Sequence, residues 1–131
     1  MASKTAAEVQ ASTPANEQGP SGNPVDFEHL ARYTLGEPEL EREVLGLFCS
    51  QSVLLLDQLR AAKSDEDWKQ AAHSLKGSAR AIGAWRMAQA AEQAEALQGD
   101  GLSELRSARV DEVEASLREA EAYIATVLES R

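Results

Sequence analysis

The sequence contains a single cysteine, Cys49, among its 131 residues. One thiol can form no disulfide within the chain and cannot supply a four-cysteine zinc site. We interpret Cys49 as a buried, unreactive thiol in a reducing compartment. The sequence also lacks an apolar run of the roughly 18 residues that cross a bilayer, and its first residues lack the apolar stretch of a secretory signal. These absences predict a cytoplasmic protein that makes no contact with a membrane.

Aromatic residues are scarce at 5%, and the 43% hydrophobic fraction is dominated by alanine, leucine and valine. This composition favours helices over strands, because strands are enriched in aromatic and β-branched residues. Positive charge is also scarce, and the formal net charge is -9. Nucleic acids and anionic membranes both require a basic protein surface, so neither is expected as a partner. The length suits one domain with its own core.

The order of apolar residues and helix breakers predicts a tail followed by five helices. Residues 1–24 contain almost no large apolar side chain, so we expect a disordered N-terminal tail. Helical periodicity covers residues 25–33, 37–62, 66–83, 84–98 and 103–129. The connections between the long helices are short, which favours antiparallel neighbours. We therefore predict an all-α protein in which residues 25–131 form an up-and-down antiparallel four-helix bundle with a short additional N-terminal helix.

Several residues mark the expected helix ends. Asp26 is a suitable N-cap for the first helix, and Pro38 suits the first turn of the second. Ser64 and Asp67 have the spacing of a capping box, and Gly83 suits the position just after a helix. In the first helix His29 lies off the apolar face without a partner ligand, so we interpret it as a solvated surface histidine.

The helix at 37–62 carries more apolar side chains than one core contact needs. The stripe predicted to face the core consists of Leu40, Val44, Leu47, Phe48, Gln51, Leu55 and Leu59. Three further residues broaden it, namely Val53, Leu54 and Leu56. The excess indicates either additional burial or an exposed docking patch, and the sequence does not decide between the two.

The helix at 66–83 shows one histidine on its outward side. Its apolar sector consists of Trp68, Ala71, Ala72, Leu75, Ala79 and Ile82. His73 lies outside this sector, with Lys69 one turn before it, Lys76 and Gly77 one turn after it, and Arg80 two turns after it. A cluster of cations around one imidazole is unusual in so acidic a chain, and we take it as the candidate site.

Two chemistries for His73 have little support. A metal site needs a second ligand at a spacing such as four residues, but Lys69 and Gly77 stand there and cations repel a metal, so we predict no metal. A general base needs a nucleophile on its own face of the helix. Ser74 and Ser78 are near in sequence but lie on other faces, so this signal is weak.

The third chemistry is acceptance of a phosphoryl group by His73 itself. An exposed imidazole is largely neutral at cytoplasmic pH, so one ring nitrogen keeps a lone pair for attack. Lys76, Lys69 and Arg80 can balance the charge on the phosphoryl oxygens. Gly77 costs about 1 kcal/mol relative to alanine inside a helix, and its missing Cβ clears space beside the imidazole for another protein.

These residues also carry a family resemblance. The signature of histidine-containing phosphotransfer (HPt) domains, H-x-x-K-G-[SA], closely resembles the stretch His73-Ser74-Leu75-Lys76-Gly77-Ser78-Ala79, which is followed by Ile82-Gly83-Ala84. The segment Thr34-Leu35-Gly36-Glu37-Pro38-Glu39 and the apolar helix after it are similar to the first part of that family, so the resemblance covers roughly residues 25–129. It implies a phosphorelay intermediate in which His73 takes a phosphoryl group from a receiver-domain aspartate and passes it to another receiver. It assigns Lys76 to phosphate stabilisation and Gly77 to steric access, whereas Lys69 and Arg80 lie outside the signature.

The resemblance implies response-regulator receiver domains or a hybrid sensor kinase as partners, docked around His73 and on apolar surface of the helix at 37–62. No glycine-rich phosphate loop is visible, so we expect no kinase activity, no cofactor and a magnesium ion held by the partner. We expect a monomer. One alternative is a non-catalytic helical module that binds or sequesters a response regulator. Another is the dimerisation and phosphotransfer part of a sensor kinase, which would be an obligate dimer.

Overall fold

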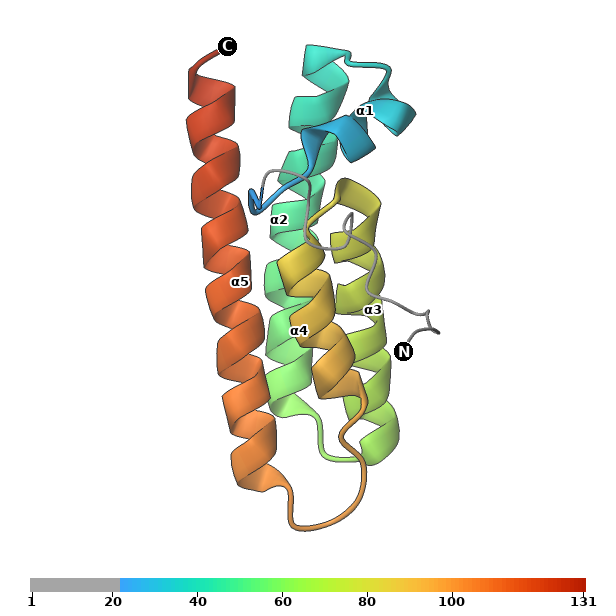
Figure 1. The fold of residues 1–131 in the computed structure, drawn as a ribbon. Coiled ribbons are helices and arrows are strands. Elements are labelled where there is room, and N and C mark those ends of the chain that lie inside the picture. Colours follow the sequence, from blue (N-terminus) through green and yellow to red (C-terminus); the bar gives the residue numbers. More distant parts are fainter. Residues whose placement is uncertain (1–21) are drawn as a thin grey trace, which may run out of the picture.

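The computed structural model describes residues 22–131, and within this range the chain forms helices and no strand. In chain order the helices are α1 (Phe27–Thr34), α2 (Pro38–Ala61), α3 (Asp65–Ile82), α4 (Trp85–Glu95) and α5 (Ser103–Glu129). Helices α2 to α5 run alternately up and down, and α1 lies at one end of the bundle that they form (Figure 1). Each long helix packs against the next, and α5 returns to pack against α2. The predicted all-α four-helix bundle with a short additional N-terminal helix is confirmed.

The predicted N-terminal tail falls mostly on residues 1–21, which lie outside the described residues, so its disorder stays a prediction. Residues 22–24 are described. The carbonyl of Gly22 accepts a hydrogen bond from Arg86 of α4, and Val25 is buried. The chain therefore contacts the bundle shortly before α1 begins.

Three predicted helix ends are confirmed, those at Asp26, Ser64 and Gly83, where residues close in sequence form the cap. The Asp26 side chain accepts a hydrogen bond from the N–H of His29 at 3.1 Å, and the Ser64 hydroxyl accepts one from the N–H of Asp67 at 3.1 Å. Gly83 ends α3 in the left-handed conformation with φ of 78°. Helix α4 is shorter than predicted, because it ends at Glu95 rather than near residue 98.

The core side of α3 is the predicted one. All six apolar side chains expected to face the core are buried, namely Trp68, Ala71, Ala72, Leu75, Ala79 and Ile82. The facing side of α4 is also rich in small side chains, since it buries Ala88, Ala91 and Ala94. Small residues on both helices allow the two backbones to approach closely. As a result, side chains at the edge of the interface between α3 and α4 come into contact.

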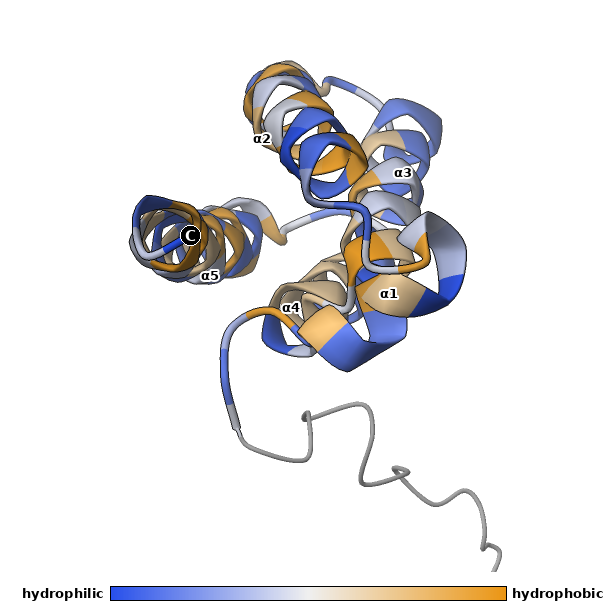
Figure 2. Cartoon of the chain, turned by 90° about the horizontal axis from the view of Figure 1, so that it is seen from above, coloured by the Kyte–Doolittle hydropathy of each residue, from blue (hydrophilic) through white to orange (hydrophobic). Residues whose placement is uncertain are grey.

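The predicted core stripe of α2 is confirmed at Phe48 and Leu59, but elsewhere it is wrong by about one residue. The side chains that the structure buries are Glu41, Leu45, Phe48, Ser52, Leu56 and Leu59. Leu40, Leu47, Val53 and Leu54 are exposed instead. Seen down the bundle, the ribbon of α2 has the colour of hydrophobic residues on its outer as well as its inner side (Figure 2). Periodicity could not select the inner side, because two polar residues occupy it and leucines occupy the outer side.

The buried carboxylate of Glu41 is accounted for by its partners. Its Oε2 accepts a hydrogen bond from the Thr34 hydroxyl at 2.9 Å, and its Oε1 pairs with the guanidinium of Arg131. A buried charge is tolerated only when it is paired in this way. These contacts connect the corner between α1 and α2 to the C-terminal end of α5.

Helix α1 is attached to the turn between α3 and α4. The N–H of Asp26 donates to the carbonyl of Gly83 at 2.9 Å, and the indole N–H of Trp85 donates to Asp26 Oδ2 at 3.2 Å. The ring of His29 lies 4.8 Å from the Trp85 ring and 5.5 Å from the Tyr33 ring. The interpretation of His29 as a solvated histidine is therefore wrong, because it is half-buried against aromatic rings.

Cys49 is half-buried rather than fully buried. Burial, and to a lesser degree the charge of Glu121, raises the pKa of its thiol above the ordinary value. A higher pKa keeps the sulfur protonated and unreactive at neutral pH. The thiol therefore has the unreactive character expected for it.

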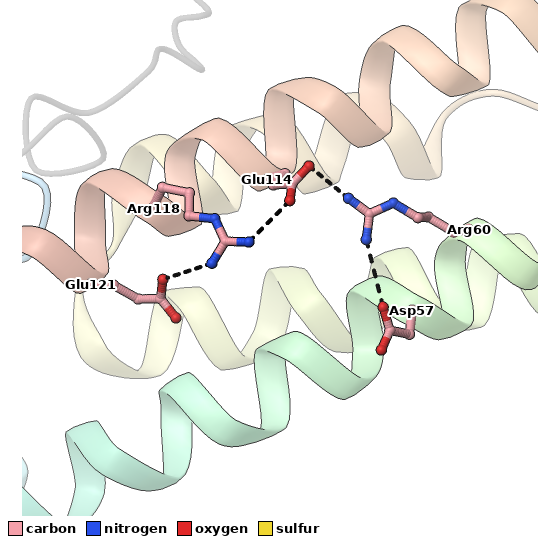
Figure 3. A network of polar contacts seen from close by, with 5 residues as sticks. All are labelled: Asp57, Arg60, Glu114, Arg118 and Glu121. Carbon is pink, nitrogen blue, oxygen red and sulfur yellow. Dashed lines mark hydrogen bonds and ion pairs between the residues drawn. The ribbon is translucent and has the colours of Figure 1, made fainter.

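A chain of ion pairs covers the seam between α2 and α5, on the edge of the bundle opposite the α3–α4 pair (Figure 3). Arg60 contacts Asp57 at 3.5 Å and Glu114 at 2.6 Å, and Arg118 contacts Glu114 at 3.2 Å and Glu121 at 3.3 Å. Exposed pairs of this kind stabilise a fold only slightly.

Within residues 22–131 no helix combines the length and apolarity needed to cross a membrane.

Candidate functional site

The outward face of α3 has the composition that its sequence predicts. His73 is the most prominent group on it, with 69% of its side chain exposed. Lys69 and Gly77, one turn before and one turn after it, are exposed as well. The side chains of Lys76 and Arg80 are partly covered. The structure thus brings all five predicted site residues to one face, but the two partly covered cations turn toward α4.

A carboxylate of α4 that sequence reasoning missed joins this group. Glu95 Oε2 lies 3.0 Å from Nδ1 of His73, and its Oε1 lies 2.7 Å from Nζ of Lys76. One carboxylate therefore contacts two of the five predicted site residues, His73 and Lys76. No local pattern could identify Glu95, because the contact depends on how closely α3 and α4 pack.

The charge of Glu95 is well defined. The hydrogen bond from Lys76 is the largest influence and lowers the pKa of this carboxyl group below 4.5, with further lowering by His73 and an opposing effect of burial. Glu95 is therefore ionised at neutral pH and can only accept hydrogen bonds. Because Nδ1 of His73 must then donate, the hydrogen-bond network assigns the proton to Nδ1. The lone pair of the neutral imidazole is left on Nε2.

The predicted basic cluster is largely balanced by acids. Lys76 pairs with Glu95, and Arg80 Nη2 lies 3.9 Å from an oxygen of Glu92, one turn earlier on α4. Among the described residues Lys69 forms no ion pair within 4.0 Å. The roles predicted for Lys69 and Arg80 stay predictions.

Gly77 has no structural reason to be a glycine. It lies inside α3 with helical backbone, and a Cβ built on it would meet no atom of the described residues within 4 Å outside the adjacent helical backbone. By contrast, a Cβ on Gly83 would lie 2.8 Å from the Cβ of Asp26. The open space at Gly77 therefore faces outward, beside His73.

His73 lines neither of two hollows that the described residues form. A cavity of about 780 Å³ opens at the other end of α3, around Trp68, Arg106 and the connection between α4 and α5, and His73 does not line it. A shallower hollow of about 440 Å³ runs between α2 and α3, with Gln58 and Ser74 on its walls. An exposed imidazole outside a cavity is suited to a macromolecular partner rather than to an enclosed small molecule.

In a comparison with protein families, residues 43–123 match the Hpt domain. The matched range is more than half of the chain and contains all of α3 and α4 together with most of α2 and α5. Comparisons with curated proteins and with solved structures gave no match. The family match agrees with the resemblance found at His73 and with the helical bundle. The chain therefore belongs to the Hpt domain family, whose members act in the phosphorelay of two-component signalling.

Proposed function

We propose that Nε2 of His73 accepts a phosphoryl group from the aspartyl phosphate of one receiver domain and passes it to the aspartate of another. One observation carries this proposal: His73 is exposed while the ionised carboxylate of Glu95 accepts a hydrogen bond from its Nδ1–H, with Nδ1 and Oε2 3.0 Å apart. The nucleophilic nitrogen therefore faces away from the bundle with its lone pair available.

The transfer is a displacement at phosphorus. The Nε2 lone pair forms the new N–P bond while the bond between phosphorus and the aspartate oxygen breaks, and that electron pair stays on the carboxylate. Lys76 lies one turn from His73 and can leave Glu95 to contact the phosphoryl oxygens, with Lys69 and Arg80 adding positive charge nearby. Both end states are high-energy phosphates, so transfer can run in either direction.

Gly77 supports the approach of a partner. It gives up about 1 kcal/mol of helix stability without relieving any contact with residues 22–131 outside the adjacent helical backbone. The proposed function explains this glycine by a contact with a partner. A docked receiver that brings its aspartate to His73 would need the space that a methyl group would fill.

The exposed leucines of α2 provide the rest of the docking surface. Leu40, Leu47 and Leu54 recur every seven residues, so they lie along one side of α2. Gln58 continues this row and lines the hollow between α2 and α3 together with Ser74, the neighbour of His73. The exposure of the three leucines, together with this hollow beside α3, favours the docking interpretation over additional burial.

The test uses the two histidines of the chain as a matched pair. Incubation with a phosphorylated receiver should label the wild-type protein, and His73→Gln should abolish the label. His29→Gln removes the other histidine and should leave the label intact, provided that circular dichroism shows an unchanged fold. Label that persists in His73→Gln would refute the proposal.

The exposed leucines also fit the second candidate, a non-catalytic module that binds or sequesters a response regulator. That module would bind a receiver equally well after His73→Ala, and no phosphoryl transfer would be detected at any time. The dimeric alternative has less support, because most of the apolar stripe of α5 is buried inside the bundle. Those buried there are Val110, Val113, Leu117, Ala120 and Ile124.

A further inference from the structure

We propose that Glu95 is a positioning residue that keeps a proton on Nδ1 of His73 after phosphorylation, and so keeps the phosphohistidine able to give up its phosphoryl group. This inference rests on the proposed function, because it concerns the phosphorylated form of the same histidine. The juxtaposition that carries it is the Glu95 carboxylate at hydrogen-bond distance from Nδ1, on the opposite side of the ring from Nε2.

The proton on Nδ1 decides how well the imidazole leaves. When Nε2 bonds to phosphorus, the ring still holds the Nδ1 proton and gains one positive charge. If the proton stays, cleavage of the N–P bond returns the electron pair to Nε2 and releases a neutral imidazole. If the proton has passed to water, the same cleavage must release an imidazolate anion, which is a much stronger base and a poorer leaving group.

A carboxylate holds this proton in a way that a neutral acceptor cannot. The oxygen of an amide could accept the same hydrogen bond, but it would supply no negative charge to oppose the positive ring. A negative group within about 4–6 Å favours the charged form of its neighbour. Glu95 is well suited to this role, because hydrogen bonds from Lys76 and from His73 lower the pKa of its carboxyl group, and the one from His73 remains when Lys76 turns away.

The other charges around the ring come from α3 and α4. Those of α3 are the cations Lys69, Lys76 and Arg80, and α4 adds Glu92. Glu92 faces Arg80 rather than the ring. Among the described residues no hydrogen bond or ion pair joins His73 to a charged side chain of α1, α2 or α5. When Lys76 turns to the phosphoryl oxygens, Glu95 is left facing the ring alone.

The test is the pH dependence of onward transfer. Wild-type protein and Glu95→Gln are phosphorylated with phosphoramidate, and single-turnover transfer to a receiver is followed from pH 6 to pH 8.5. We expect the two rates to agree within about twofold at pH 6. At pH 8.5 the variant should be slower by roughly tenfold or more, because an imidazole without a charged partner loses its proton near pH 6.5 and a tenfold loss follows for each further unit.

The control is Glu92→Gln, which removes the same charge one turn earlier on α4 and should keep the wild-type pH profile. The receiver's own titration cancels in the ratio of the two rates at each pH. A ratio of wild type to Glu95→Gln that does not change with pH would overturn the inference, since a structural disturbance or the release of Lys76 lowers the rate equally at every pH. Failure to phosphorylate wild-type His73 at all would instead contradict the proposed function.

A second measurement needs no variant. In phosphorylated wild-type protein labelled with ¹⁵N, the Nδ1 resonance of His73 should remain that of a protonated nitrogen at pH 8. An unprotonated Nδ1 at that pH would overturn the inference even if Glu95→Gln failed to fold.

Discussion

Replacing Gly77 by alanine should make the protein more stable and less active at the same time. Gly77 lies inside α3, and its Cβ position is open, with no atom of the described residues within 4 Å beyond the adjacent helical backbone. The methyl group would therefore meet no steric obstacle in the free protein. It would, however, project into the space beside His73 that the partner is proposed to use.

The stability change follows from helix propensity alone. Alanine is favoured over glycine by about 1 kcal/mol inside a helix, and no clash offsets this gain. For a bundle of this size that corresponds to a rise of roughly 4 °C in Tm. A docked partner cannot give way to the methyl group as solvent does, so phosphoryl transfer should slow at least tenfold, which is about 1.4 kcal/mol in the transition state.

The assay compares Gly77→Ala with Gly46→Ala. Gly46 lies inside α2, is exposed, and likewise has no neighbour within 4 Å of its Cβ position. Thermal unfolding should show a similar gain for both variants, whereas transfer from a phosphorylated receiver should slow only in Gly77→Ala. The steric interpretation is refuted if Gly77→Ala gains stability and still transfers at the wild-type rate. A loss of stability in Gly77→Ala would refute the structural part of the reasoning.

Three further changes test the packing and the docking surface. Gly83→Ala forces alanine into the left-handed conformation and places its Cβ 2.8 Å from the Cβ of Asp26. Urea unfolding should therefore show a free energy of unfolding lower by about 2–4 kcal/mol. A decrease below 1 kcal/mol would contradict this contact. Leu47 and Leu54 are 64% and 63% exposed, so changing both to serine should alter the free energy of unfolding by less than about 1 kcal/mol. The double variant should bind a receiver more weakly in a titration. An unchanged affinity would show that these leucines are not part of the docking surface. The Ser52 hydroxyl is buried without a hydrogen-bond partner in the described structure, so Ser52→Ala should raise the free energy of unfolding by about 1 kcal/mol in urea titrations, and a decrease would reveal an unseen partner.

Most of α3 could be predicted from the sequence, because its features depend on short-range geometry. A helix turns by about 100° per residue, so one buried row of apolar side chains places His73 on the outside without knowledge of any other helix. The same is true of the ends of α3, where the Ser64 hydroxyl and the left-handed Gly83 act within one turn of the chain.

The inner side of α2 could not be predicted in this way. Glu41 and Ser52 are buried although both are polar, while Leu47 and Leu54 are exposed although both are apolar. Glu41 is stabilised by Thr34 and by Arg131 from the far end of the chain. Since these partners lie outside α2, only the assembled bundle could tell the core side of α2 from its outer side.

By itself the sequence determined the helices, the family and the exposed histidine with its lysine and glycine. Each of these depends on the spacing of residues along one continuous stretch of the chain. Only the tertiary structure brought Glu95 of α4 to His73 and Lys76 of α3. The physical reason is that Glu95 is far from His73 and Lys76 along the chain, so no local pattern connects them. The small alanines between α3 and α4 allow the two helices to approach closely, and this approach brings the three residues together. On that contact rests the assignment of the proton to Nδ1 of His73, and with it the proposal that Nε2 is the nitrogen that reacts.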